Sequence, residues 1–99
     1  MNLFAVRFHD KPDKLATRSQ FLQAHLDWLN IHKNTILVAG SLRLSPDQGA
    51  IGGLWIVQAE EKNQIEQLLV EDPFWKAGLR ERVEISFWSK AFPDRMTLI

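Results

Sequence analysis

The sequence lacks cysteine and tyrosine, and neither sign of charge is in excess, because twelve acidic residues balance twelve basic ones. Without cysteine there are no disulfide bonds, no thiolate nucleophile and no thiolate-ligated zinc or iron–sulfur site. Without a basic excess, the electrostatic footprint of a nucleic-acid-binding protein is missing. No apolar run approaches the roughly 20 residues of a membrane span, and the N-terminus does not resemble a secretory signal. We therefore expect a cytoplasmic protein that binds neither nucleic acid nor membrane.

Histidine is also scarce, and its spacing argues against a metal site. His9, His25 and His32 are scattered, and no two of them have the i, i+4 spacing of a helical metal-binding pair. Zinc is therefore not expected. Axial ligation of a haem by His25 is the metal-dependent alternative that the residues leave open. We expect no cofactor.

The chain does contain a regular alternation of strand and helix patterns. Strand patterns cover residues 2–8, 36–44, 50–58 and 82–89, and helical patterns cover residues 14–32 and 60–71. Pro46 and Gly49 lie between the two central strand patterns, as expected for a turn. The order β-α-β-β-α-β predicts an α+β fold of the ferredoxin-like type, in which both helices cover one face of an antiparallel four-stranded sheet.

We expect a single domain over residues 1–99, with a core over 1–89 and a C-terminal tail over 90–99. The first and last predicted strands carry large apolar side chains on both faces, so a sheet covered on one face only would expose aromatic residues. A homodimer that packs sheet against sheet would cover them. The apolar tail either adds an edge segment or covers the neighbouring subunit.

Two polar residues lie on the apolar face of the first predicted helix. At about 100° per residue, Arg18 and His25 lie within the apolar arc that runs from Trp28 round to Leu26. The residues alone favour a structural explanation, with His25 bonded to a backbone carbonyl and Arg18 extending its head group to solvent. In the functional alternative, the imidazole of His25 is a general acid or base.

The segment 72–79, Asp-Pro-Phe-Trp-Lys-Ala-Gly-Leu, has the full signature of a one-turn helix. Asp72 suits the N-cap, Pro73 the first helical position, and Gly78 the left-handed residue that ends the turn. A cap explains Asp72 without any function. However, one carboxylate oxygen can cap while the other accepts from a histidine, so Asp72 is also a candidate to orient His25.

Glycines interrupt two neighbouring predicted strands, at Gly40-Ser41 and at Gly52-Gly53. Glycine weakens a strand unless a bulge or a close backbone approach requires it. These two glycine sites indicate either a cleft or the tight packing of a helix on the sheet. They match no phosphate-binding loop, and Ser41 lacks the strand-turn-helix setting of a nucleophilic serine.

The order and spacing of these residues resemble the YCII-related (YciI-like) family over roughly residues 1–89. The resemblance is carried by Arg18, by His25-Leu26, by the two glycine sites and by the Asp-Pro-Phe and Ala-Gly-Leu blocks of segment 72–79. It implies a dimeric α/β-barrel fold and an active-site pair at His25 and Asp72. Some relatives are associated with cofactor-free chemistry on chlorinated hydroquinones, and the wider superfamily includes muconolactone isomerase.

Two positions depart from the family pattern. Ser41 stands where members often have proline, and Leu22 stands where they often have a basic residue, which leaves Arg18 as the nearest helical cation for an anionic substrate. We predict a cofactor-independent lyase or isomerase in which His25 transfers a proton and Asp72 orients it. Arg18 and the two glycine sites would bind a small anionic or aromatic molecule. The alternative is a non-catalytic module for ligand binding or dimeric assembly.

Overall fold

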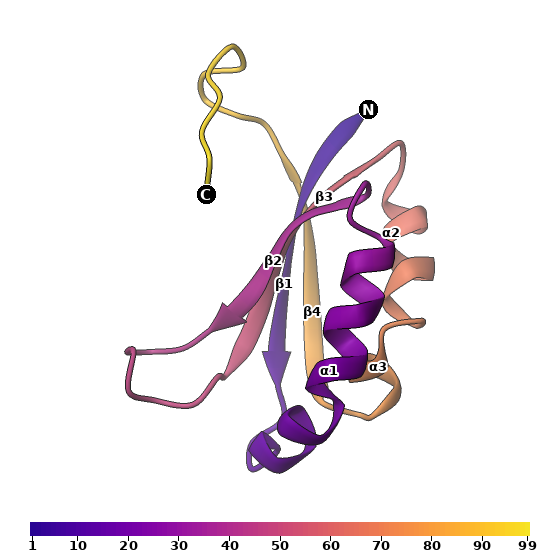
Figure 1. The fold of residues 1–99 in the computed structure, drawn as a ribbon. Coiled ribbons are helices and arrows are strands. Elements are labelled where there is room, and N and C mark those ends of the chain that lie inside the picture. The colour runs from indigo at the N-terminus through magenta and orange to yellow at the C-terminus, as the bar shows by residue number, and fades with distance from the viewer.

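The computed structural model describes residues 1–99 as a four-stranded antiparallel sheet with helices on one face (Figure 1). Along the chain the elements are β1 (Asn2–Asp10), α1 (Leu15–Ile31), β2 (Ile36–Leu42), β3 (Gly52–Ala59), α2 (Lys62–Leu69), α3 (Pro73–Lys76) and β4 (Arg80–Trp88). The strand order is β2-β3-β1-β4. The predicted ferredoxin-like α+β fold is confirmed, and the elements lie close to their predicted bounds.

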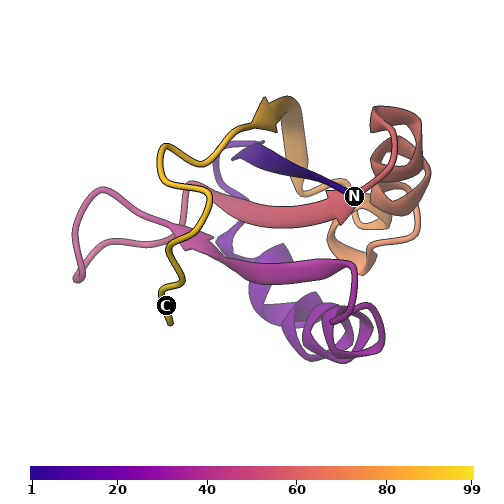
Figure 2. The same ribbon diagram turned by 90° about the horizontal axis from the view of Figure 1, so that it is seen from above.

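The hydrophobic core lies between the helices and the inner face of the sheet. Alternation along β1 turns Phe4, Val6 and Phe8 to this face, and β3 adds Trp55 and Val57. The helices cover the same face in both views of the ribbon (Figure 1, Figure 2). The core cluster consists of nine buried apolar residues: Phe4, Val6, Phe8, Ile36, Trp55, Val57, Ala59, Ile65 and Leu69.

Helix α1 covers this core less completely than its leucine pattern predicts. Three leucines of the predicted apolar face are exposed at 41–54%: Leu15, Leu22 and Leu26. His25 is 7% exposed, and α1 packs on the core through Trp28 and Leu29. Most of the leucines on the predicted apolar face are therefore not buried in the core, because periodicity identifies an apolar face but not what that face contacts.

The outer face of the sheet carries no helix. Its apolar side chains include Leu3, Val38, Leu54, Ile56 and Trp88. Residues 89–99 follow β4 without forming a helix or strand, and they lie on the side of the sheet opposite the helices (Figure 1). Between these residues and the outer face is an apolar cavity of about 420 Å³.

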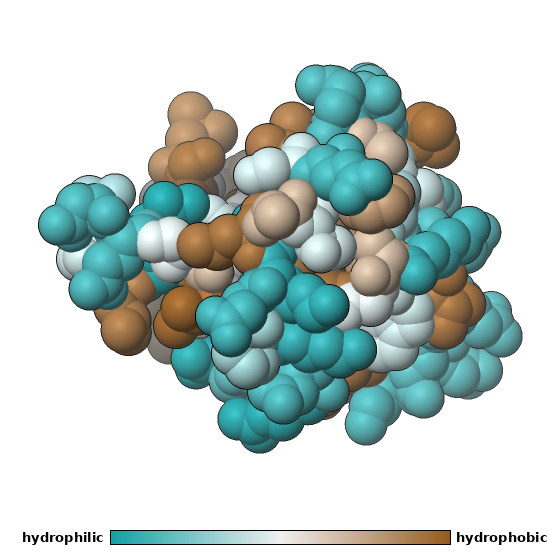
Figure 3. Space-filling view, turned by 90° about the horizontal axis from the view of Figure 1, so that it is seen from below, coloured by the Kyte–Doolittle hydropathy of each residue, from teal (hydrophilic) through white to brown (hydrophobic).

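The end of the sheet where β1 leads into α1 brings several connections together. The β2–β3 connection projects from this end, and β4 begins there (Figure 1). Seen from below, hydrophilic side chains are interspersed with apolar ones over this end (Figure 3).

The helices are too short or too polar for any of them to span a membrane.

Candidate functional site

A cleft of about 310 Å³ opens between α1 and the sheet. One wall is apolar and consists of Leu22, Leu26 and Leu29 of α1, with Trp55 of β3. The polar side chains that line it are Arg18, Ser19, His25, Ser41, Arg43 and Arg80. Two of the three unexpectedly exposed leucines, Leu22 and Leu26, therefore face this cleft, which we call the His25 cleft.

His25 joins the cleft to Asp72. Nδ1 of His25 lies 2.7 Å from Oδ1 of Asp72, and Asp72 is 1% exposed. Because an ionised carboxylate only accepts, the Nδ1–H of His25 donates, and in the neutral ring the lone pair lies on Nε2. Nε2 has no partner within the chain and is not fully buried, so it keeps some accessible surface, and His25 is one of the residues that line the cleft. The partner of His25 is thus a carboxylate, not the backbone carbonyl that the residues alone favoured.

Helix α3 fixes the position of Asp72. The backbone N–H of Phe74 donates to Oδ1 of Asp72 at 3.1 Å, Pro73 occupies the first turn, and Gly78 has a φ of 74° just beyond the helix. The ring of Phe74 stacks on the imidazole of His25, with centroids 3.9 Å apart. A single oxygen therefore serves both the cap and the histidine, whereas the sequence suggested one oxygen for each. The other oxygen, Oδ2, is buried without a partner.

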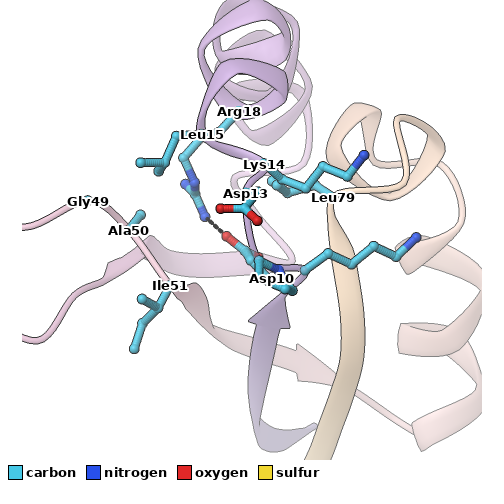
Figure 4. Close-up of a pocket in the computed structure, with 11 residues that line it drawn as sticks. Asp10, Asp13, Lys14, Leu15, Arg18, Gly49, Ala50, Ile51 and Leu79 are labelled. Carbon is cyan, nitrogen blue, oxygen red and sulfur yellow. Dashed lines mark hydrogen bonds and ion pairs between the residues drawn. The ribbon is translucent and has the colours of Figure 1, made fainter.

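Arg18 is held by an ion pair and does not extend to solvent. Its Nη2 donates to Oδ2 of Asp10 at 2.6 Å (Figure 4). The same Nη2 donates to the carbonyl of Gly52 at 3.2 Å. Nη1 of Arg80 donates to the other oxygen of Asp10 at 2.7 Å. Burial lowers the pKa of Arg80 from its ordinary value; Asp10 opposes this effect, and the charge of Arg18 adds to it.

Sequence reasoning missed Asp10 and Arg80. Neither residue belongs to a motif, and both stand at the ends of strand patterns. Asp10 lies opposite Arg80 because the β1–β4 pairing shifts register between His9 and Asp10. An alignment of the alternating apolar residues of the two strands would place Asp10 opposite Glu81, so the sequence carries no signal for the pair.

The glycine at position 52 is required by the approach of two strands. A Cβ atom on Gly52 would lie 2.0 Å from the carbonyl oxygen of Phe8. Gly52 does not line the His25 cleft, but its carbonyl accepts from Arg18. It therefore supports the cleft from the sheet side.

Gly53 lies close to the backbone of β2. A Cβ atom there would lie 3.1 Å from the carbonyl oxygen of Gly40, which is a tight contact, and 3.5 Å from both terminal nitrogens of Arg80, which is an ordinary one. Gly40 itself has open space where its Cβ would be, and Gly40 and Ser41 line the cleft. The glycines at positions 52 and 53 thus accommodate backbone groups of neighbouring strands, and not a tightly packed helix.

A second cleft, of about 340 Å³, shares Arg18 with the first (Figure 4). It lies between the β1–α1 connection and the end of the β2–β3 connection, and charges of both signs line it, including Asp10, Asp13 and Lys14. Neither His25 nor Asp72 reaches it. We therefore assign the candidate site to the His25 cleft, although the second cleft is slightly larger. The structure contains no group of three or more histidine, aspartate or glutamate side chains that could hold a metal ion.

The family model for the YCII-related domain matches residues 2–89. The chain belongs to the YCII-related family. This confirms the resemblance drawn from the sequence motifs. No curated protein matches the sequence.

Two solved structures are similar to this YCII-related chain. One is 5-chloro-2-hydroxyhydroquinone dehydrochlorinase from Burkholderia phenoliruptrix, in complex with 2,5-dihydroxybenzoquinone. It is 28% identical, with a TM-score of 0.80 over 88% of this chain and 93% of that chain. The other is an uncharacterized NIPSNAP domain protein from Burkholderia xenovorans. It is 19% identical, with a TM-score of 0.50 over 95% of this chain and 100% of that chain, and this likeness concerns the fold alone.

Proposed function

We propose that this YCII-related protein is a cofactor-independent lyase or isomerase in which His25 transfers protons on a small hydroxylated ring compound. The observation that carries the proposal is the accessible Nε2 of His25, opposite an Nδ1–H bound to the buried Asp72. A histidine oriented in this way accepts a proton on Nε2, and the carboxylate stabilises the imidazolium that forms. The fold alone would not select a reaction, but the similarity to the dehydrochlorinase supports this substrate class.

The proposed chemistry balances without an oxidant or reductant. Nε2 removes the proton of a ring hydroxyl, the electron pair of that O–H bond enters the ring, and the imidazolium protonates a ring carbon. The product of this isomerase step is a keto tautomer. If that carbon carries chlorine, removal of the proton from a second, conjugated hydroxyl forms another carbonyl while chloride departs. Overall, the ring loses one proton and one chloride ion.

We expect His25→Asn to lower the rate of proton transfer by about 10²- to 10⁴-fold. Asparagine places an amide N–H near the position of Nδ1, so Asp72 keeps a donor, but no base replaces Nε2. Two assays measure the effect: chloride release from 5-chloro-2-hydroxyhydroquinone, and deuterium exchange into the ring of 2,5-dihydroxybenzoquinone.

The matched control is His32→Asn, because His32 lies on the loop after α1 and does not line the cleft. It should leave both rates unchanged. If the unmodified protein accelerates neither reaction over buffer, the proposal is wrong, and a non-catalytic ligand-binding module is the better interpretation.

We also propose that the outer face of the sheet forms the interface of a homodimer. Val38, Leu54 and Trp88 on this face are exposed at 36–40%, and no helix covers them. Pairing two such faces would remove these apolar side chains from water. The similarity in fold to dimeric α/β barrels supports the same arrangement.

Ile56→Asp should convert the dimer to a monomer, because it places a charge at an apolar position of this face, opposite Ala5 and Val38. Light scattering coupled to size-exclusion chromatography measures the mass. Gln67→Asp on the exposed side of α2 adds the same charge and should leave the mass unchanged. A monomeric wild-type protein at tens of micromolar would contradict the dimer.

A further inference from the structure

The charged side chains that line the His25 cleft are all arginines. Arg18 comes from α1, Arg43 follows β2, and Arg80 begins β4, whereas no aspartate or glutamate lines the cleft. Arg43 is exposed and donates to Ser41 Oγ at 3.1 Å. The charged groups on the lining itself are therefore all positive, and the carboxylates Asp10 and Asp72 contact the lining side chains without lining the cleft.

The pair Arg18 and Arg80 is only partly neutralised. Asp10 accepts from Nη2 of Arg18 and Nη1 of Arg80, so one carboxylate serves two guanidinium groups. Nη1 of Arg18 and Nη2 of Arg80 have no partner within the chain and are not fully buried, while both Nε atoms are buried without a partner. The pair thus keeps one unit of positive charge and free donors on two side chains that line the cleft.

One aromatic ring fixes both arginines relative to the histidine. The guanidinium carbons of Arg18 and Arg80 lie 5.1 Å and 5.2 Å from the centroid of the Phe74 ring, and the imidazole of His25 stacks on that ring. Arg80 is also 4.3 Å from the centroid of Phe8, and only 4% of its side chain is exposed. The two cations are therefore positioned before any ligand binds.

The rest of the cleft suits an apolar molecule. The leucines of α1 and Trp55 of β3 give the cleft apolar surface, and its volume of about 310 Å³ falls at the lower end of small-molecule sites. The arginines and the apolar lining together favour a ligand that has an apolar ring and one ionised group.

We infer that the His25 cleft binds small organic monoanions with an apolar ring, whose ionised oxygen is held by Arg18 and Arg80 while the ring contacts the leucines of α1. This inference names the substrate class for the proposed function. Binding of the anion does not depend on the proposed function; only the claim that the bound molecule reacts rests on it. The same two arginines would stabilise the oxyanion that forms when His25 removes a hydroxyl proton.

The test uses 4-nitrophenol, whose absorbance reports its ionisation, and nitrobenzene as its neutral counterpart. We expect the wild-type protein to shift 4-nitrophenol toward the phenolate at constant pH and to bind it at least about tenfold more tightly than nitrobenzene. Arg18→Gln and Arg80→Gln should each weaken phenolate binding by about tenfold or more and leave nitrobenzene binding unchanged. Lys33→Gln removes an exposed charge outside the cleft and should change neither affinity.

Equal affinity of the wild-type protein for the phenolate and for nitrobenzene would overturn the inference, even if Arg80→Gln does not fold. Binding and proton transfer measured on the wild-type protein separate this inference from the proposed function. Phenolate binding without any proton transfer in the wild type would support the anion site and contradict the enzyme. Proton transfer without preference for the anion would contradict the anion site and leave the enzyme.

Discussion

Replacing Gly52 with alanine should lower the free energy of unfolding by more than about 3 kcal/mol. The added Cβ would lie 2.0 Å from the carbonyl oxygen of Phe8, and both atoms belong to paired strands, β3 and β1. A flexible side chain could move away, but here the two central strands of the sheet would have to separate. Separation would also shift the Gly52 carbonyl that accepts from Arg18. Urea denaturation followed by circular dichroism measures the loss.

Gly40→Ala is the matched control, since it makes the same change in the neighbouring strand. A Cβ atom at Gly40 has no neighbour within 4 Å, so its effect should stay within about 0.5 kcal/mol. An equal loss of stability in both variants would contradict the steric explanation. It would instead indicate that both strands need the conformational freedom of glycine.

The order of elements could be predicted because each element has its own local pattern. Phe4, Val6 and Phe8 alternate along β1, and Asp72, Pro73 and Gly78 mark both ends of α3 without reference to the rest of the chain. Such signals depend on residues a few positions apart. The local preferences that they indicate are kept in the folded protein because its tertiary contacts favour the same strands and helices.

The site could be predicted only in part, because its contacts join distant positions. Asp72 and His25 are 47 positions apart. Their chemistry made them a candidate pair and the family resemblance implied the same pair, but no local pattern could place them in contact. Asp10 and Arg80 are 70 positions apart, and only the β1–β4 register joins them. Periodicity also could not distinguish a leucine that faces the core from Leu22, which faces a cleft.

Replacing Asp72 with alanine should lower the free energy of unfolding by about 2–4 kcal/mol, as the sum of two losses. Alanine removes the N-cap acceptor of Phe74, worth about 1 kcal/mol. It also leaves the buried Nδ1–H of His25 unpaired, at about 1–3 kcal/mol. Thermal or urea unfolding measures this sum but does not separate a structural residue from one that positions a base.

Asp72→Asn separates the two roles. The amide oxygen still accepts from Phe74 and His25, so the stability loss should be smaller than for alanine, about 1–2 kcal/mol. The negative charge is gone, however, and the imidazolium formed in the reaction loses its stabilising partner, so the rate should fall by about 10²- to 10⁴-fold. Nitrogen NMR of the imidazole reports whether the proton stays on Nδ1.

The neighbouring Glu71 supplies the control, because it is exposed and lies one residue before the cap. Glu71→Gln removes the same charge and should change neither stability nor rate. If Asp72→Asn keeps the full rate while Asp72→Ala only unfolds more easily, Asp72 is a helix cap and nothing more, since a positioning role requires the charge beside His25. If the asparagine variant folds and loses the rate, the same oxygen that caps the N-terminus of α3 also directs the proton chemistry, because Oδ1 makes both contacts.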